Sequence, residues 1–230
     1  TGSLCGGSLE GSVVTEYRPD LPLRVTIDAS VDKATMVDLT QILIPDKVMK
    51  QGVGTGKIYL EIPCANPTST KGNGVLFLDD AYLSKTPILA DLFNHVKIKL
   101  DKSDLYCVFD LAGDMMTVKT GHLATHVWAV NFEPGGTIQY TGGPVDMYAI
   151  FLPLKRAGAI LSLLDPLKLF VKQVLRLHIT GTVGDTKIVA APFSDLKKVP
   201  AGALELLAEV AKTGGQLGGG IINAILKGGK

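Results

Sequence analysis

The clearest pattern in the chain is an alternation of apolar and polar positions between residues 21 and 32. In the stretch LPLRVTIDASVD every odd position is apolar, and every even position is polar or proline. A period of two is typical of a β-strand with one dry face and one wet face. Because a strand rises about 3.3 Å per residue, this one is predicted to be roughly 40 Å long. Its apolar face needs a partner, which can be a sheet, a helix or a ligand.

Shorter alternations follow along the chain, and several begin after a pair or an alternation of glycines. GVGTGKIYLEI from Gly52 and GNGVLFL from Gly72 are examples. Glycine at a strand entrance permits bulges and sharp curvature. The predicted strands span residues 4–17, 21–32, 53–62, 72–80, 103–111, 115–120, 122–132, 135–150, 177–183 and 186–191.

Amphipathic helices are fewer than the predicted strands. Residues 34–44 place apolar side chains on one side, and Pro45 ends that helix. Thr86 and Pro87 are predicted to begin a second helix as its N-cap and first helical residue. Its apolar stripe consists of Ile88, Leu89, Leu92, Phe93 and Val96. Further helices are predicted over residues 155–175 and 200–212.

The arrangement of these elements indicates the fold class. Strands predominate, and helices do not follow each strand in turn, which argues against a parallel sheet of βαβ units. We therefore expect a mainly β fold: a long, curved antiparallel sheet with a few short amphipathic helices over one end or face. Residues 1–200 are predicted to form this β-rich domain, and residues 201–230 a C-terminal amphipathic helix and glycine-rich tail.

Composition narrows the function classes. Hydrophobic residues make up 46% of the 230 positions but aromatic residues only 6%, so the apolar surface is mainly aliphatic. The formal net charge of +1 argues against a nucleic-acid partner, which usually requires a concentrated basic face. The chain has no run of 18 uncharged apolar residues and no signal peptide, and its start at Thr1 indicates that it is cut from a longer protein.

Motifs for nucleotide or metal binding are incomplete. GVGTGK at Gly52 has three residues between its outer glycines and leads into a strand, whereas a phosphate-binding loop has four and leads into a helix. His122 and His126 are four residues apart, but GHLATHVWAV is predicted to be one strand, which separates them by about 13 Å. The three cysteines fit neither a zinc cluster nor a disulfide framework.

Residues that could support catalysis are also scattered. Asp79 and Asp80 are predicted to point to opposite faces of a strand, and Asp104 to lie with Asp101 in a solvated turn. Trp128 is predicted to be a core residue. No Ser-His-Asp or Cys-His arrangement identifies a nucleophile. We therefore expect a protein that is not an enzyme and that has no catalytic residues, cofactor or metal.

Several stretches carry a family resemblance. GNGVLFLDDAYLSKTPILADLFNHV (72–96) resembles the signature of the AsmA-like C-terminal region, with glycine alternation, an apolar strand and a helix beginning at proline. FDLAGDMMTVKTGHL (109–123), GGTIQYTGGPVDM (135–147) and LHITGTVGDTKIVAAPF (177–193) continue in the family's order. The opening CGGSLEGSV is similar to the family's strand entry. The resemblance covers roughly residues 4 to 200.

The resemblance implies a trough-shaped, β-rich fold of the bridge-like lipid-transfer group. Members of this group are usually anchored in the bacterial inner membrane, extend into the periplasm and are implicated in moving phospholipid towards the outer membrane. The resemblance thus implies a periplasmic protein, anchored in the inner membrane through a segment outside this chain. Its implied partners are phospholipid or another acyl-chain lipid and other envelope proteins.

The first functional hypothesis is a lipid-binding and transfer module that shields acyl chains in a hydrophobic β-groove. The candidate groove-floor residues are Leu23, Val25, Ile27, Ile58, Leu60 and Ile62. The alternative is a non-catalytic structural or interaction module with a closed core, in which the same strand faces are core. A third hypothesis, a hydrolase, requires distant residues such as His122 and Asp104 to meet in a cleft.

Overall fold

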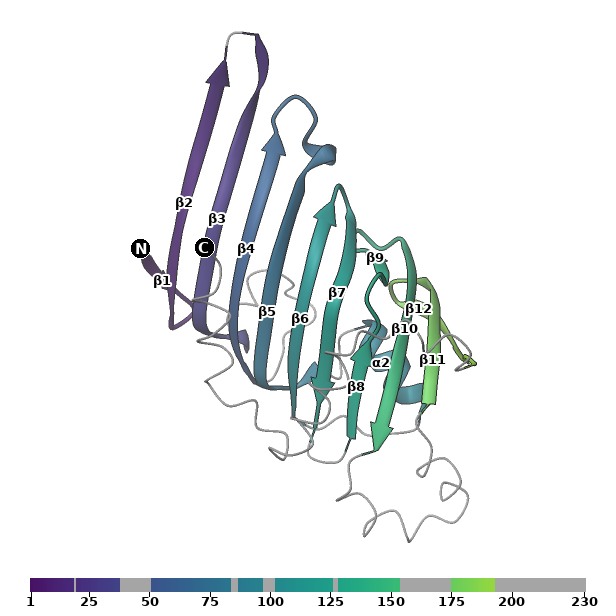
Figure 1. The fold of residues 1–230 in the computed structure, drawn as a ribbon. Coiled ribbons are helices and arrows are strands. Elements are labelled where there is room, and N and C mark those ends of the chain that lie inside the picture. Colours follow the sequence, from purple (N-terminus) through teal and green to yellow (C-terminus); the bar gives the residue numbers. More distant parts are fainter. Residues whose placement is uncertain are drawn as a thin grey trace, which may run out of the picture.

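The computed structural model describes residues 1–18, 20–37, 51–83, 87–96, 102–125, 128–153 and 175–192. Within these ranges the chain forms one sheet of twelve strands, all paired antiparallel, together with helix α2 and a single turn of 3-10 helix (Figure 1). The strands are β1 (Gly2–Leu4), β2 (Gly7–Arg18), β3 (Leu21–Thr35), β4 (Val53–Pro63), β5 (Lys71–Ala81), β6 (Ser103–Ala112), β7 (Met115–Ala124), β8 (Trp128–Phe132), β9 (Thr137–Gln139), β10 (Pro144–Pro153), β11 (Leu175–Thr182) and β12 (Asp185–Ala190). The helices are η2 (Pro67–Ser69) and α2 (Pro87–His95). The predicted mainly β, antiparallel fold is confirmed.

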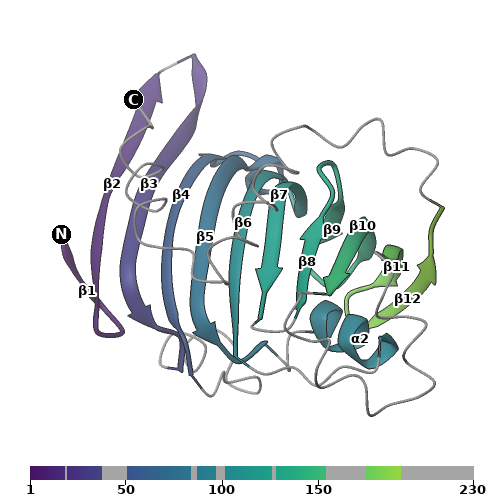
Figure 2. The same cartoon turned by 60° about the horizontal axis from the view of Figure 1, so that its bottom comes forward.

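Nearly every strand pairs with its neighbour in the sequence. The order across the sheet is β1-β2-β3-β4-β5-β6-β7-β8-β10-β11-β12, and the short β9 pairs with both β7 and β10. Figure 2 shows α2 near β11 and β12, at the end of the sheet away from β2. The sheet therefore has two different ends: a long hairpin of β2 and β3, and shorter strands with a helix beside them.

The predicted strand boundaries are wrong at three hairpins. Predicted strand 4–17 is divided by a two-residue turn at Cys5 and Gly6, both of which have positive φ angles (49° and 78°) as in a type I′ turn. Predicted strand 122–132 is divided where the Thr125 backbone N–H donates to the Trp128 carbonyl. Predicted strand 135–150 is divided where the Gly142 and Gly143 N–H groups donate to the Gln139 carbonyl. At the first and third of these hairpins the sequence has a Gly-Gly pair, which marks a turn and not a strand entrance, and only around Thr125 does apolar alternation conceal the turn.

Helix α2 confirms the helix predicted after Thr86. Leu89, Leu92 and Phe93 of its apolar stripe are buried, and the remaining two residues of the stripe pack against the same core. Leu175 begins strand β11, so the predicted helix 155–175 is wrong at its last residue. The other predicted helical parts lie outside the described residues: 155–174, residues 38–44 of the first helix, and the tail 201–230.

The buried core lies beneath one face of the sheet towards β12. Along this face Leu123 is opposite Val130, Val130 is opposite Phe151, and Phe151 is opposite Leu175. Trp128 packs between Phe93 of α2 and Phe151, with ring centroids 4.5 and 5.6 Å away. Only 3% of Trp128 is exposed, which confirms it as a core residue.

The opposite face of β3 to β7 carries charged pairs. Arg24 pairs with Glu61 at 3.7 Å, Lys57 with Asp28 at 3.3 Å, and Lys119 with Asp110 at 2.7 Å. All of these side chains are at least one-third exposed, so each pair contributes little stability. Their effect is to make this face hydrophilic, so the sheet is amphipathic over β3 to β7.

Candidate functional site: the apolar face of β2 to β5

The six residues predicted as a groove floor lie on one face of β3 and β4. Val25 is directly opposite Ile62, and Ile27 is directly opposite Leu60. Ile58 is opposite Ala29 one step further along the same face. Leu23 lies at the far end, where its carbonyl accepts a hydrogen bond of 2.8 Å from the Cys64 N–H. The register therefore brings all six together, although the sequence alone specified only which strands were amphipathic.

The apolar face continues onto β2. Val13 lies opposite Ile27, and Leu9 lies opposite Val31. Directly opposed residues of an antiparallel pair point to the same side of the sheet, so these side chains extend the surface formed by β3 and β4. We call the combined surface of β2 to β5 the apolar face. Its β2 members were not among the residues predicted for the site.

On β5 the apolar face contains two glycines, whose positions are filled by neighbouring side chains. Gly72 lies opposite Leu60, and Gly74 lies opposite Ile58. A Cβ atom at Gly74 would come within 2.5 Å of the Phe109 ring, so that ring lies over the glycine. The glycine alternation seen in the sequence thus lets side chains of β4 and β6 lie flat across β5.

Burial separates the β2 to β4 part of the apolar face from the core, which the face reaches at β5. None of the six predicted residues belongs to the buried core cluster, and Leu23 is 38% exposed. Val13 is 68% exposed, whereas Leu123 and Ile179, which lie on the same face towards β12, are completely buried. Among the described elements, those in extensive contact with β3 are its sheet neighbours β2 and β4. The described part of the chain therefore places no second layer over the apolar face.

Cys107 on β6 continues this surface towards the core. It lies opposite Leu76 on β5 and opposite Gly121 on β7, and it packs against the core cluster. Burial raises the pKa of its thiol to about 11, so the side chain is protonated at neutral pH and behaves as a small apolar group. All three cysteines of the chain are free thiols, and none forms a disulfide.

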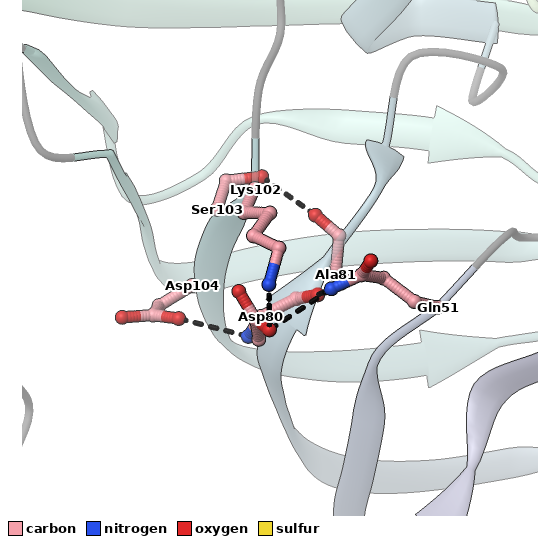
Figure 3. Close-up of polar contacts among 6 residues, drawn as sticks. All are labelled: Gln51, Asp80, Ala81, Lys102, Ser103 and Asp104. Atoms are coloured by element: carbon pink, nitrogen blue, oxygen red, sulfur yellow. Dashed lines mark hydrogen bonds and ion pairs between the residues drawn. The ribbon is translucent and has the colours of Figure 1, made fainter.

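A second candidate site, a cluster of carboxylates, lies at a bulge in β5 (Figure 3). The register between β5 and β6 shifts between Leu78 and Ala81, and Asp80 has a φ of 53°. The Asp80 carboxylate accepts a hydrogen bond of 2.9 Å from Gln51 and pairs with Lys102 at 2.6 Å. These contacts tie β5 to the chain segments before β4 and before β6. The expectation of regular alternation at Asp79 and Asp80 therefore fails, because the strand is bulged there.

Asp104 lies within β6, so its placement in a solvated turn is wrong. One of its carboxylate oxygens accepts a 3.0 Å hydrogen bond from the Asp80 backbone N–H. Burial raises the pKa of the Asp104 carboxyl to about 6, and the nearby Asp79 contributes to the rise. The cluster thus contains a carboxyl that can be protonated in mildly acidic solution, but its partners are residues of the same sheet. Asp101, its predicted companion, lies outside the described residues.

His122 lies on the charged side of the sheet and is 4% exposed. Its Nδ1 is hydrogen-bonded to the Asn131 side-chain oxygen, and burial lowers the pKa of the imidazole. Among the described residues, neither the His122 Nε2 nor the Asn131 amide nitrogen finds a hydrogen-bond partner. Asp104 bonds to Asp80 instead, so the two residues that a hydrolase was expected to combine are hydrogen-bonded to different partners. His126 lies outside the described residues, and the single strand predicted to contain both histidines is interrupted.

A cluster around Arg176 was not found from the sequence. The guanidinium donates two hydrogen bonds to Glu133, at 2.6 and 2.8 Å, and lies 4.2 Å from the centroid of the Tyr148 ring. His178 stacks on that ring and approaches Asp146 at 2.7 Å. Arg176 is 43 positions from Glu133 and His178 is 32 positions from Asp146, and the pairing of β10 with both β8 and β11 brings these residues together. The cluster links the residue after the C-terminal end of β8 to β11.

Metal clusters, membrane-spanning helices and similarity to known proteins are further indications of function. Within the described ranges, no group of three or more His, Cys, Asp or Glu side chains is placed to hold a metal ion. The helical segments that the structure describes include none that is both long and apolar enough to cross a membrane. No protein-family model matches the chain, and comparisons with curated proteins and with solved structures also give no match.

Proposed function

We propose that the protein is a non-catalytic lipid-binding module that holds acyl chains along the apolar face of β2 to β5. The observation that carries this proposal is the half-exposed aliphatic surface formed by the β2–β3–β4 register outside the buried core. A water-soluble domain rarely leaves so continuous an apolar surface without a ligand or partner. The opposite side of the same strands is charged and requires no such cover.

The chemistry of the surface suits a hydrocarbon chain. On β3 and β4 its side chains are mainly Val, Leu and Ile, which offer dispersion contacts but no directional polar group. Each methylene group of a lipid removed from water contributes about 0.8 kcal/mol. Since neighbouring strands lie about 4.8 Å apart, four strands provide a surface roughly 14 Å wide, enough for acyl chains to lie side by side. A uniform aliphatic surface also permits a chain to slide, as transfer requires.

The sequence resemblance to the AsmA-like C-terminal region supports the same function. It would place the protein in the periplasm of a bacterium, in a parent anchored to the inner membrane, with phospholipid as cargo moving towards the outer membrane. The twelve-stranded antiparallel sheet is compatible with that expectation. The resemblance and the half-exposed surface are independent arguments, since one uses glycine motifs and the other uses burial.

The test is native mass spectrometry and lipid extraction of the purified protein, with two matched variants. Ile27→Asp places a carboxylate on the apolar face, whereas Ser30→Asp places one on the charged side of the same strand, opposite Lys57. We expect the original protein and Ser30→Asp to retain phospholipid and Ile27→Asp to lose it, with all three giving the same circular dichroism.

Two outcomes would contradict the proposal. A folded protein free of lipid, which also takes up none from phospholipid vesicles, would favour a structural module. The second is unfolding of Ile27→Asp alone, together with milder Ile27→Asn and Leu60→Asn variants that either unfold or keep their lipid uptake; that result would show that this face is closed core.

A further inference from the structure

Among the described strands, only the short β1 pairs with the outer edge of β2, and it covers a small part of that edge. β1 pairs only with Gly7, Ser8 and Leu9. From Glu10 to Arg18 no described strand lies beside the outer edge of β2, and every side chain in that stretch is exposed. The backbone groups of alternate residues there point away from β3. A long exposed edge of this kind is a template for another strand.

The centre of this edge lacks the usual protection against pairing. Edge strands commonly avoid association through central charges, prolines or bulges. Here the centre is Val13 and Val14, which are 68% and 50% exposed, and the register shift of β2 occurs only between Glu16 and Arg18. The other edge differs, because β12 is six residues long and carries the exposed Lys187, and Thr186 is bound by Asp91 of α2. The β2 edge is therefore the more favourable one for strand addition.

We infer that two copies of this chain dimerise by antiparallel pairing of their β2 strands across Glu10–Arg18. Placing Val14 opposite Val14 of the second copy defines a two-fold symmetric register. In that register Glu10 faces Arg18, Gly11 faces Tyr17, and Val13 faces Thr15 of the second copy. Each dimer then contains two opposite-charge pairs, and opposed charges stabilise a strand pair. The exposed Tyr17 ring covers the glycine opposite, an arrangement that stabilises strand pairs containing glycine.

The backbone supports the same register. The tight hairpin between β1 and β2 leaves Leu4 and Gly7 as the hydrogen-bonded pair that closes its turn. Counting by twos from Gly7, residues Gly11, Val13 and Thr15 direct their N–H and C=O groups away from β3. The proposed register pairs Val13 with Thr15, both of which are in this set, so their backbone groups meet. Val13 belongs to the apolar face, so the dimer would join the two apolar faces into one surface.

The proposal does not depend on lipid binding, and sedimentation equilibrium over a range of concentrations tests it. The original chain is expected to be a dimer. Glu10→Arg and Arg18→Glu each replace two opposite-charge pairs by two like-charge pairs, and each is expected to weaken dimerisation about tenfold. An equimolar mixture of the two variants restores opposite charges at both positions, so it is expected to recover dimers that contain one copy of each. Lys187→Glu on the other edge is the matched control and should leave dimerisation unchanged.

Three results would overturn the inference. The first is a monomer at all concentrations. The second is a dimer that is unaffected by both charge reversals or is not restored by mixing. The third is growth beyond the dimer, which indicates pairing of β2 with β12 of the next copy. Circular dichroism of each variant confirms that any loss of dimer does not result from unfolding.

Discussion

Two isoleucines on the same side of the sheet offer a direct test of how the two halves differ. Ile179 in β11 is completely buried and lies between Met147 and Ile188, whereas Ile27 in β3 is half-buried and lies between Val13 and Leu60. Truncation to alanine removes the same atoms at both positions. In a filled core this truncation costs about 2–5 kcal/mol, because a cavity is added to the lost transfer free energy. At Ile27 water already reaches the side chain and no cavity forms, so we expect a loss of about 1 kcal/mol.

Urea unfolding followed by circular dichroism measures this difference. We expect Ile179→Ala to lower the free energy of unfolding by about 2 kcal/mol more than Ile27→Ala, with the dependence on urea unchanged in both. Equal losses of 3 kcal/mol or more would refute the reasoning, because they would show that β3 is covered as deeply as β11. A change in the slope of the unfolding free energy against urea, seen for Ile27→Ala alone, would show that the β2–β4 half unfolds separately. The two halves would then be fitted as separate unfolding transitions.

The remaining predictions concern single contacts. Asp104→Asn is expected to raise the melting temperature at about pH 8, and the gain should shrink as the pH falls through 6 towards 4. The reason is that the pKa of Asp104 is raised to about 6 in the folded protein, so the charged carboxylate destabilises the fold above that pH, whereas asparagine stays neutral. Below pH 6 the carboxyl is protonated, and the advantage of asparagine disappears. A gain independent of pH would contradict this reasoning. Gly72→Ala should cost about 1–3 kcal/mol in urea unfolding, since its Cβ would collide with the Tyr59 carbonyl; a loss under about 0.5 kcal/mol would show that the strands can separate freely. Arg176→Lys should cost about 1.5–3 kcal/mol in thermal unfolding, because lysine cannot make both hydrogen bonds to Glu133, and an unchanged melting temperature would show that the pair adds nothing.

The sequence was most informative for strands whose alternation of apolar and polar residues can be read from their own positions alone. The alternation at 21–32 predicted β3 because each side of that strand has one environment, apolar on one side and charged on the other. The helix after Thr86 was also predictable, since its apolar spacing and Pro87 are local signals. Fold class followed from the proportions of such elements.

Features that depend on two distant segments could not be predicted in the same way. The bulge at Asp80 has no glycine or proline to mark it, and it is stabilised by Gln51 and Lys102 from other strand connections. The turn at Thr125 is a local exception: its polar contacts are made within the turn itself, and it was missed because the alternation runs across it. Which apolar strand faces are core and which are half-exposed depends on what packs over them, and no single strand carries that information.

The neighbour-to-neighbour strand order has a consequence for how the chain folds. From β1 to β8 each strand pairs with the next one along the chain, so the sheet can grow by adding one hairpin at a time without closing a long loop. Folding can begin where α2, β10 and β11 bury the core and then spread towards β2, with each added strand stabilised mainly by the one before it. The same strand order allows a sheet to be extended by inserting whole hairpins, because an added pair of strands contacts only the strands on either side of it. A family built in this way could change the length of its sheet while keeping one folding nucleus.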